Sequence, residues 1–211
     1  MDMISRFLNQ WRKPTGRLGR VLASVLNVSH SKGVSWGLQH ITIEKNFSIL
    51  DVGCGGGEFV HELAGIVTEG QVYGIDYSAD CVVVSRRTNR QWIKLGRAEI
   101  LLGSVSSLPF SNRKFDLVTA VNSHYYWPDL VSDMQEVLRV LRPGGRLVLM
   151  GESYKGGKYE IRDRKFVELV HLAYYSVNEL REFFSSTGYS DVQMFEEYDR
   201  GWICGIGRKP S

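Results

Sequence analysis

The sequence predicts an α/β domain in which a mostly parallel sheet carries helices on both faces. The first observation is local. Apolar residues 49–52 form a short strand pattern, residues 53–57 are rich in glycine, and apolar residues then recur at helical spacing. The second observation is the order of the whole chain, because short apolar runs alternate with helical patterns, as is typical of parallel sheets. At 211 residues, 43% of them apolar, the chain fits one domain with a sizeable core.

The other elements follow from the same patterns. Strands are expected at residues 49–52, 71–76, 98–105, 114–122, 146–152, 191–198 and 201–209. Helices are expected at residues 58–67, 79–93, 130–141 and 178–188, with a turn at residues 142–145. Ser176 and Glu179 have the spacing of a capping box, and Gly188 suits the left-handed end of the last helix. The last two strands are expected to form an antiparallel pair at the sheet edge.

Composition argues against several classes of protein. A net charge of +3 and a pI of about 8.7 are too weakly basic to indicate nucleic-acid binding. Cys54, Cys81 and Cys204 lack metal-ligand spacing, so we expect reduced thiols and no metal site. No apolar run reaches the roughly 18 residues of a membrane span, and no secretion signal is recognised. A cytoplasmic location is therefore the default expectation.

The spacing of the glycine turn indicates its ligand. A dinucleotide fingerprint, G-x-G-x-x-G, counted from Gly53 would place its third glycine at Glu58, where a carboxylate would repel a pyrophosphate. This disfavours a nicotinamide-dependent oxidoreductase. The pattern present is D-x-G-x-G-x-G, which begins at Asp51. An acid beside the glycine turn suits a cationic ligand.

Three segments carry a resemblance to a known family. The run ILDVGCGGGEF at residues 49–59 resembles motif I of the class I S-adenosylmethionine (SAM)-dependent methyltransferases, and EVLRVLRPGGRLVL at residues 136–149 resembles another of their hallmarks. The segment with LPF at residues 108–110 is similar to the quinone- and menaquinone-biosynthesis members. The resemblance covers roughly residues 49–150. It implies a Rossmann-like fold with a mostly parallel seven-stranded sheet, a terminal antiparallel strand, and a helical N-terminal cap.

The resemblance also implies a division of the chain. Residues 1–47 are expected to form a helical cap or lid, as is common in this family, and residues 48–211 the SAM-binding domain. Ile4, Phe7, Leu8 and Trp11 are spaced as one helical face, and a further segment around Trp36 is expected before the first strand. The basic, amphipathic start of the chain would also suit a membrane surface, but the cap is the favoured interpretation.

The cofactor implied by the resemblance is SAM, with S-adenosylhomocysteine as the product. Asp76, at the end of the second strand, is expected to accept the ribose hydroxyls, and Tyr77 to lie against the adenine. Ser104 stands where the family has an acid that bonds the adenine amine, and the backbone N–H of Val105 is expected at the ring. The backbone carbonyl of Asn122 is expected to hold the SAM ammonium. The glycine turn contributes Asp51, Gly53, Cys54, Gly55 and Gly57.

Catalysis is expected to come mainly from holding acceptor and methyl group in line. An acceptor that keeps its proton also needs a base, and His124 is the first candidate because an unperturbed imidazole titrates near neutrality. Tyr125 is the second, and its ring also suits a sulfonium. The weaker base candidates are His30, Tyr126 and Tyr154. Glu152, just past the fifth strand, is a candidate to orient a polar acceptor.

The acceptor is expected to be a small molecule: a thiol, a phenol, a quinone-like ring or an amine. The stretch N-S-H-Y at residues 122–125 lacks the paired prolines common among methyltransferases of nucleic-acid bases, so no nucleic acid is expected. Two alternatives remain open. One is a non-catalytic regulatory protein that binds SAM or S-adenosylhomocysteine, and the other is a methyltransferase that acts on protein or RNA. The sequence does not indicate the oligomeric state.

Overall fold

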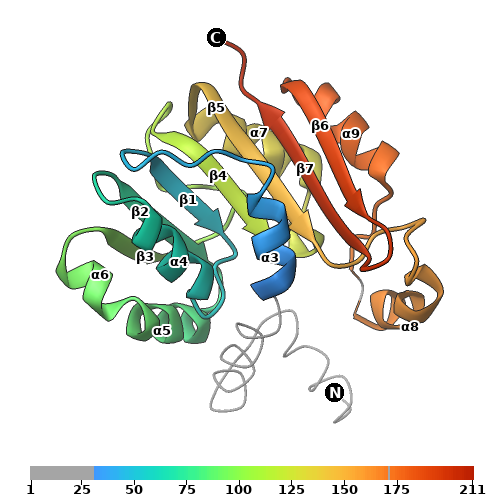
Figure 1. The fold of residues 1–211 in the computed structure, drawn as a ribbon, viewed down its shortest axis with the longest axis horizontal. Helices are drawn as coiled ribbons and strands as arrows, with labels where there is room; N and C mark the ends of the chain where they lie inside the picture. The colour runs from blue at the N-terminus through green and yellow to red at the C-terminus, as the bar shows by residue number, and fades with distance from the viewer. Residues whose placement is uncertain (1–30, 171) are drawn as a thin grey trace.

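A computed structural model describes residues 31–170 and 172–211 (Figure 1). Its seven-stranded sheet has the order β3-β2-β1-β4-β5-β7-β6. The strands are β1 Ser48–Val52, β2 Gln71–Asp76, β3 Ala98–Leu102, β4 Phe115–Val121, β5 Leu141–Gly151, β6 Ser190–Glu197 and β7 Trp202–Arg208. The first five strands are parallel, and β7 runs antiparallel to both β5 and β6. This confirms the expected fold class, including the antiparallel pair at the edge.

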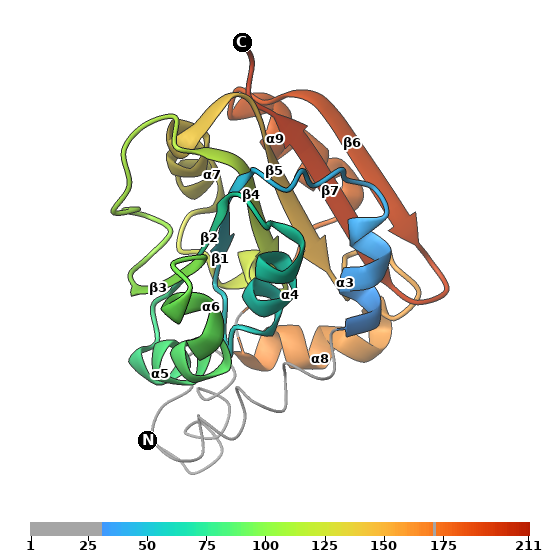
Figure 2. The same ribbon diagram turned by 60° about the vertical axis from the view of Figure 1, so that its left-hand side comes forward.

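Helices cover both faces of the sheet (Figures 1 and 2). They are α3 Ser31–Leu38, α4 Glu58–Ile66, α5 Ala79–Thr88, α6 Arg90–Lys94, the 3-10 helix η1 His124–Tyr126, α7 Leu130–Val140, α8 Glu160–Val170 and α9 Val177–Ser186. Because side chains alternate along a strand, Ile49 packs with residues of α3, α4 and α5, whereas Leu50 packs with residues of α7 and α9. The protein therefore has two apolar cores, one on each face.

Several element boundaries differ from the expected ones. The helix expected at residues 79–93 is two helices, α5 and α6, separated at Asn89, whose side-chain amide donates to the carbonyls of Gly57 and Ser85. The third strand ends at Leu102 rather than at residue 105. Helix α8 was not expected at all. It lies beyond the ends of β4 and β5 (Figure 1).

The R-P-G-G segment is not a separate turn before the fifth strand, as expected, but the irregular start of β5. Phe115 pairs with Leu141 and Leu117 with Arg146, so β5 carries extra residues between the two pairs. Gly144, inside this bulge, has a φ of 79°. Pairing with β4 therefore stops after Leu141 and resumes at Arg146, on either side of the residues that were expected to form the turn.

The start of α9 confirms the capping box. The hydroxyl of Ser176 accepts from the N–H of Glu179 over 3.3 Å, and the Glu179 carboxylate accepts from the N–H of Ser176 over 2.8 Å. Gly188 follows the helix with a φ of 96°, which a residue with a Cβ rarely adopts. Both ends of this helix are therefore determined by local sequence.

The structure describes residues 31–47 of the expected cap, and these begin with helix α3, which packs on β5 and β7. Its contact face includes two glycines beside the buried Val34. A Cβ added at Gly33 would lie 2.7 Å from Oε1 of Glu152, and one at Gly37 would lie 2.6 Å from the sulfur of Met150. The helical face expected at residues 4–11, and His30, lie outside the described residues. None of the helices in residues 31–170 and 172–211 has the length and apolar character that crossing a bilayer requires.

Candidate functional site

The candidate site lies at the carboxyl ends of the parallel strands. Asp51 and the glycine turn belong to the end of β1, Asp76 is the last residue of β2, and Asn122 and Glu152 directly follow β4 and β5. In open α/β sheets this edge is where ligands bind, at the point where the strand order reverses. Here the order reverses between β1 and β4.

The glycine turn has a backbone that side chains would not tolerate. Gly53, Gly55 and Gly57 have φ values of 73°, 52° and 84°. A Cβ at Gly53 would lie 2.4 Å from Cβ of Ser123, and a Cβ at Gly57 would lie 2.2 Å from the hydroxyl of Ser85. Around Gly55, by contrast, nothing lies within 4 Å of an added Cβ. The turn is thus packed on two sides and open in the middle, which suits a ligand that approaches the main chain.

Asp76 connects this turn to the second strand. Its Oδ2 accepts from the N–H of Gly55 over 2.9 Å, and its Oδ1 accepts from the N–H of Ser78 over 2.8 Å. Burial raises the pKa of Asp76, and these two hydrogen bonds act in the opposite direction. Each carboxylate oxygen keeps a further lone pair, so the residue can accept a ligand hydroxyl as well.

Asp51 is a second carboxyl group beneath the turn. It is buried, and the hydroxyl of Thr119 donates to its Oδ1 over 2.8 Å. Burial raises the pKa of Asp51 to about 7, with a smaller contribution from the charge of Asp76. The group is therefore set to change its charge near neutrality. Cys54, between them in sequence, is a buried free thiol whose pKa burial raises well above its ordinary value, which agrees with a space-filling role.

The adenine side of the expected site shows a small polar turn. The hydroxyl of Ser104 accepts from the N–H of Ser106 over 3.2 Å, and Ser104 forms a β-bridge with Ser107. The side chain of Val105 is buried, while that of Tyr77 is 43% exposed. A hydroxyl at position 104 offers an uncharged acceptor, where the family pattern has a carboxylate.

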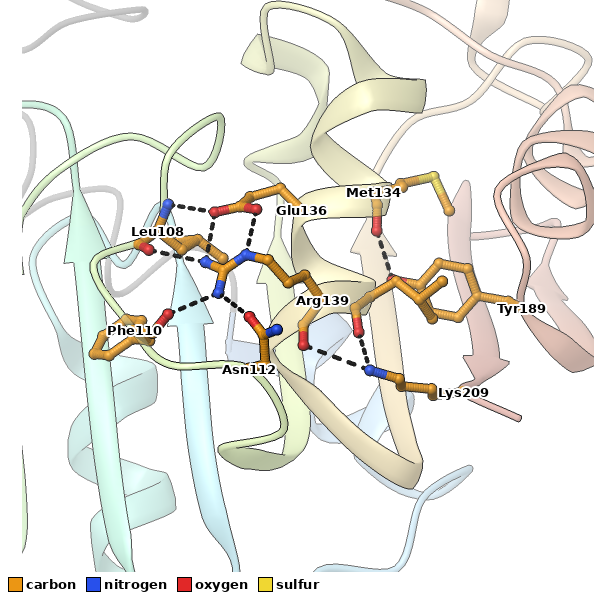
Figure 3. A network of polar contacts seen from close by, with 9 residues as sticks. Leu108, Phe110, Asn112, Met134, Glu136, Arg139, Tyr189 and Lys209 are labelled. Atoms are coloured by element: carbon orange, nitrogen blue, oxygen red, sulfur yellow. Dashed lines mark hydrogen bonds and ion pairs between the residues drawn. The ribbon is translucent and has the colours of Figure 1, made fainter. Parts of the chain in front are cut away.

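A network around Arg139 of α7 fixes the segment that follows this turn (Figure 3). The guanidinium donates to the carbonyls of Leu108 and Phe110 over 3.0 and 2.8 Å. It also donates to Oε2 of Glu136 over 2.7 Å, while Oε1 of Glu136 accepts from the N–H of Leu108. Figure 3 also shows Lys209, which donates to carbonyls at the end of α7. The chain after β3 is thereby attached to α7 along its length.

Asn122 occupies the turn after β4 with a φ of 50°, in the left-handed region. Its N–H donates to the carbonyl of Met150 over 2.9 Å, and its Oδ1 accepts from the N–H of Glu152 over 3.0 Å. The next residue, Ser123, donates its hydroxyl to the carbonyl of Val52 over 2.6 Å. The turn that follows β4 is therefore attached to both neighbouring strands.

Of the two expected catalytic side chains, that of His124 is buried and that of Tyr125 is half-buried. His124 is 1% exposed, and within the described part of the chain neither of its ring nitrogens has a hydrogen-bond partner. Burial lowers the pKa of His124 to about 3, so the imidazole stays neutral at physiological pH. The hydroxyl of Tyr125 donates to the carbonyl of Ser153, and burial raises its pKa. A role for either residue as the base stays a prediction. Of the weaker candidates, Tyr126 is half-buried and Tyr154 is buried.

A polar cluster near the ends of β4 and β5 was not found from the sequence. The hydroxyl of Ser153 donates to Oδ2 of Asp163 over 2.7 Å and lies 2.9 Å from the hydroxyl of Tyr174, which donates to the carbonyl of Tyr154 over 2.9 Å. The cluster fastens α8 and the loop after it to β5. The one signal in the sequence was the density of polar and aromatic residues just past the fifth strand.

Comparisons with known proteins agree with this geometry. The family model described as Methyltransferase domain matches residues 43–170. The demethylmenaquinone methyltransferase of Lactococcus lactis subsp. lactis (strain IL1403) is 34% identical over 108 residues, which make up 51% of this chain and 42% of that protein. This chain spans about half the length of the curated relatives that it matches.

Solved structures share the fold. A SAM-dependent methyltransferase from Aquifex aeolicus has a TM-score of 0.70 at 17% identity, with 90% of this chain and 97% of that chain covered. Phosphoethanolamine N-methyltransferase 2 of Haemonchus contortus, in complex with SAM, has a TM-score of 0.73 at 16% identity, with 86% and 53% covered. At such identities the likeness concerns the fold alone.

Proposed function

Because this chain belongs to the methyltransferase-domain family of class I SAM-dependent methyltransferases, we propose that it transfers a methyl group from SAM to a small-molecule acceptor. SAM is the cofactor of this class. When bound, it supplies an electrophilic methyl group on a sulfonium, which moves to a nucleophilic atom of the acceptor in an in-line displacement and leaves S-adenosylhomocysteine.

The observation that carries the proposal is the pair of acids joined by the glycine turn. Asp76 is hydrogen-bonded to Gly55 in the open middle of the turn, and Asp51 lies buried below it. Because the pKa of Asp51 is about 7, a nearby positive charge would favour its ionised form, so this group suits a cationic ligand. The carboxylate of Asp76 suits a ligand with hydroxyl groups. SAM has both features, with its ammonium, its sulfonium and its ribose.

The protein's own contribution is binding and orientation. We propose that Asn122 offers its backbone carbonyl to the SAM ammonium, and that Ser104 and Val105 contact the adenine ring. Because His124 is neutral and the Tyr125 hydroxyl already donates to a backbone carbonyl, we propose that these residues orient the acceptor and do not remove its proton. Positioning alone can supply several kcal/mol of a displacement barrier. An acceptor that is already nucleophilic at neutral pH, such as a thiolate or an ionised quinol, would need no base.

The acceptor class that we favour is a small aromatic or quinone-like ring. The names of the relatives support it, because the curated proteins with the matching segments are demethylmenaquinone methyltransferases. The side chains beyond β4 and β5 also support it, because they include the half-buried Tyr125, Tyr126 and Tyr174. Aromatic side chains of this kind suit a planar, partly polar acceptor.

A second function of another class has an observation in its favour. Ser104 replaces a charged adenine ligand, and the first base candidate, His124, is buried and neutral. Both features would suit a protein that binds SAM or S-adenosylhomocysteine without transferring the methyl group. The two functions differ in turnover and not in binding.

Calorimetric titration with SAM and with S-adenosylhomocysteine tests the shared step. We expect micromolar affinity for both ligands. A panel of thiols, phenols, quinols and amines is then incubated with labelled SAM, and S-adenosylhomocysteine is quantified. Binding with turnover of one acceptor class supports the proposal, binding without turnover of any class favours the regulatory function, and no binding of either ligand overturns both.

A further inference from the structure

Asn122 combines a left-handed backbone with a side chain that bonds the adjacent strand. We infer that Asn122 is a positioning residue. It holds the turn after β4 (residues 122–123, here called the donor-side turn) in its left-handed form and links it, through Glu152, to the surface on which helix α3 packs. The inference rests on the proposed function, because SAM is the ligand whose binding reports on the turn.

The backbone of Asn122 is the first step. Among the described residues, three non-glycine residues have a positive φ: Arg113, Asn122 and Asp191. Arg113 and Asp191 are exposed and lie away from the carboxyl ends of the parallel strands, whereas Asn122 lies at the edge where ligands of this fold bind. A left-handed residue with a Cβ costs about 1–2 kcal/mol, so the surrounding structure must hold it there.

The holding contacts come from β5 and the residue after it. The N–H of Asn122 donates to Met150, and its Oδ1 accepts from the N–H of Glu152, so one residue is bonded on both sides to the same segment. On its other flank, the adjacent Ser123 fills the space that Gly53 leaves open and bonds the end of β1. The turn is therefore clamped between the glycine turn and the end of β5.

Met150 and Glu152, the two residues that bond Asn122, also form part of the surface on which α3 packs. The Cβ position of Gly33 lies 2.7 Å from Oε1 of Glu152, and that of Gly37 lies 2.6 Å from the sulfur of Met150. Glycines four apart on a helix face residues two apart along the extended chain, since both repeats span about 6–7 Å. The main chain that clamps Asn122 thus carries the side chains on which α3 rests.

A continuous set of contacts therefore runs from α3 through Glu152 and Asn122 to the glycine turn. A change in how α3 sits moves the Glu152 side chain, and the N–H of the same residue holds the Asn122 amide. To show such coupling, a change at α3 must have a measurable effect at the donor-side turn. SAM affinity measures this effect, because SAM binding depends on the geometry of that turn.

Substitutions at Asn122 separate positioning from stability. In Asn122→Gly the left-handed backbone is no longer strained but the side-chain bond is lost, so we expect a melting temperature near that of the wild type and SAM affinity about tenfold weaker. Asn122→Asp keeps the accepting oxygen and should retain affinity within about threefold. Asn122→Ala should lose both stability and affinity. Wild-type SAM affinity in Asn122→Gly would overturn the inference, since a merely structural role predicts that result.

The link to α3 has a matched pair of variants. Gly33→Ala and Gly65→Ala both replace a helical glycine, and alanine is favoured there by roughly 1 kcal/mol. The added methyl group meets Glu152 at position 33, whereas nothing lies within 4 Å of it at position 65 of α4. We expect SAM affinity to weaken about threefold in Gly33→Ala only. Equal affinities in the two variants would refute the link. A wild-type protein that binds no SAM would instead refute the proposed function.

Discussion

The backbone N–H of Gly55 donates to Oδ2 of Asp76 over 2.9 Å, so the glycine turn after β1 and the end of β2 form one hydrogen-bonded unit. The other oxygen of the same carboxylate accepts from Ser78, the residue that caps α5. One buried side chain thus joins the glycine turn to the start of α5, and the two hydrogen bonds fix the orientation of its carboxylate. A ligand that bonds Asp76 meets a group whose orientation is already fixed.

Replacement of Asp76 by asparagine tests this unit. The amide has one accepting oxygen where the carboxylate has two, so one of the two backbone N–H groups would face an NH₂. We expect the free energy of unfolding to fall by about 1–3 kcal/mol and SAM affinity to fall about tenfold or more. Urea unfolding and calorimetry measure the two effects. Glu69→Gln, which neutralises an exposed partner of Lys45, is the control and should change neither.

Position 53 should require glycine for two reasons: its left-handed backbone, and the lack of space for a Cβ beside Ser123. Gly53→Ala places a methyl group 2.4 Å from the Cβ of Ser123 at a φ of 73°. Gly96→Ala has nearly the same φ, 70°, and an empty surrounding. We expect Gly96→Ala to cost about 1–2 kcal/mol from backbone strain, and Gly53→Ala to cost a further 1–3 kcal/mol or so from the overlap. Equal losses in urea unfolding would show that the contact with Ser123 gives way freely.

Local patterns predicted the parts of the fold that local interactions determine. The strand, glycine turn and helix at β1 and α4 follow from apolar spacing and from backbone freedom, and the start of α9 follows from its capping box. The break between α5 and α6 was missed because it depends on Asn89 reaching Gly57, which is 32 residues away. Helix α8 was missed because most of its side chains are exposed and leave no clear apolar stripe.

In the candidate site, too, local patterns predicted which residues come together but not the environment of each side chain. The sequence identified the acids and glycines that cluster at the strand ends, since the order of parallel strands brings those ends together. It did not identify the environment of His124, because the burial of one ring depends on the whole fold, and an imidazole expected to titrate near neutrality has its pKa lowered to about 3. Nor did it show that Ser153 meets Asp163 and Tyr174, a contact that exists only once α8 is in place.

Loss of Arg139 should loosen the chain after β3. Arg139→Ala removes the guanidinium that donates to the carbonyls of Leu108 and Phe110 and that pairs with Glu136, so we expect a loss of about 1–3 kcal/mol in stability. Hydrogen exchange should rise at residues 104–112. Arg142→Ala removes an exposed pair with Asp116 and should cost at most about 1 kcal/mol. Unchanged exchange at residues 104–112 in Arg139→Ala would contradict the role given to this network.

The raised pKa of Asp51 makes its contribution to stability depend on pH. Its pKa is about 7 in the folded protein and about 3.9 in an unfolded chain, so between these values the folded state holds the extra proton. This contribution therefore falls as pH rises from about 4 to about 7 and is constant above. Asp51→Asn removes it, so the unfolding free energy of the variant relative to wild type should rise across that window. A difference that stays constant with pH would place the pKa of Asp51 near its ordinary value.

His124 should show the opposite sign over almost the same window. Its pKa is about 3 in the folded protein and about 6.5 in an unfolded chain, so between these values the unfolded chain holds the extra proton and stability rises with pH. His124→Phe removes this term, and the unfolding free energy of the variant relative to wild type should fall from about pH 4 to pH 6.5. Urea unfolding of the wild type and of both variants at pH 4.5, 5.5, 6.5 and 7.5, chosen as roughly even steps across the window, measures the two slopes together. Because the two groups oppose each other, the stability of the wild type should vary less with pH than that of at least one variant. If the stability differences of both variants from wild type change with pH in the same direction, the shifted pKa of His124 or that of Asp51 is refuted.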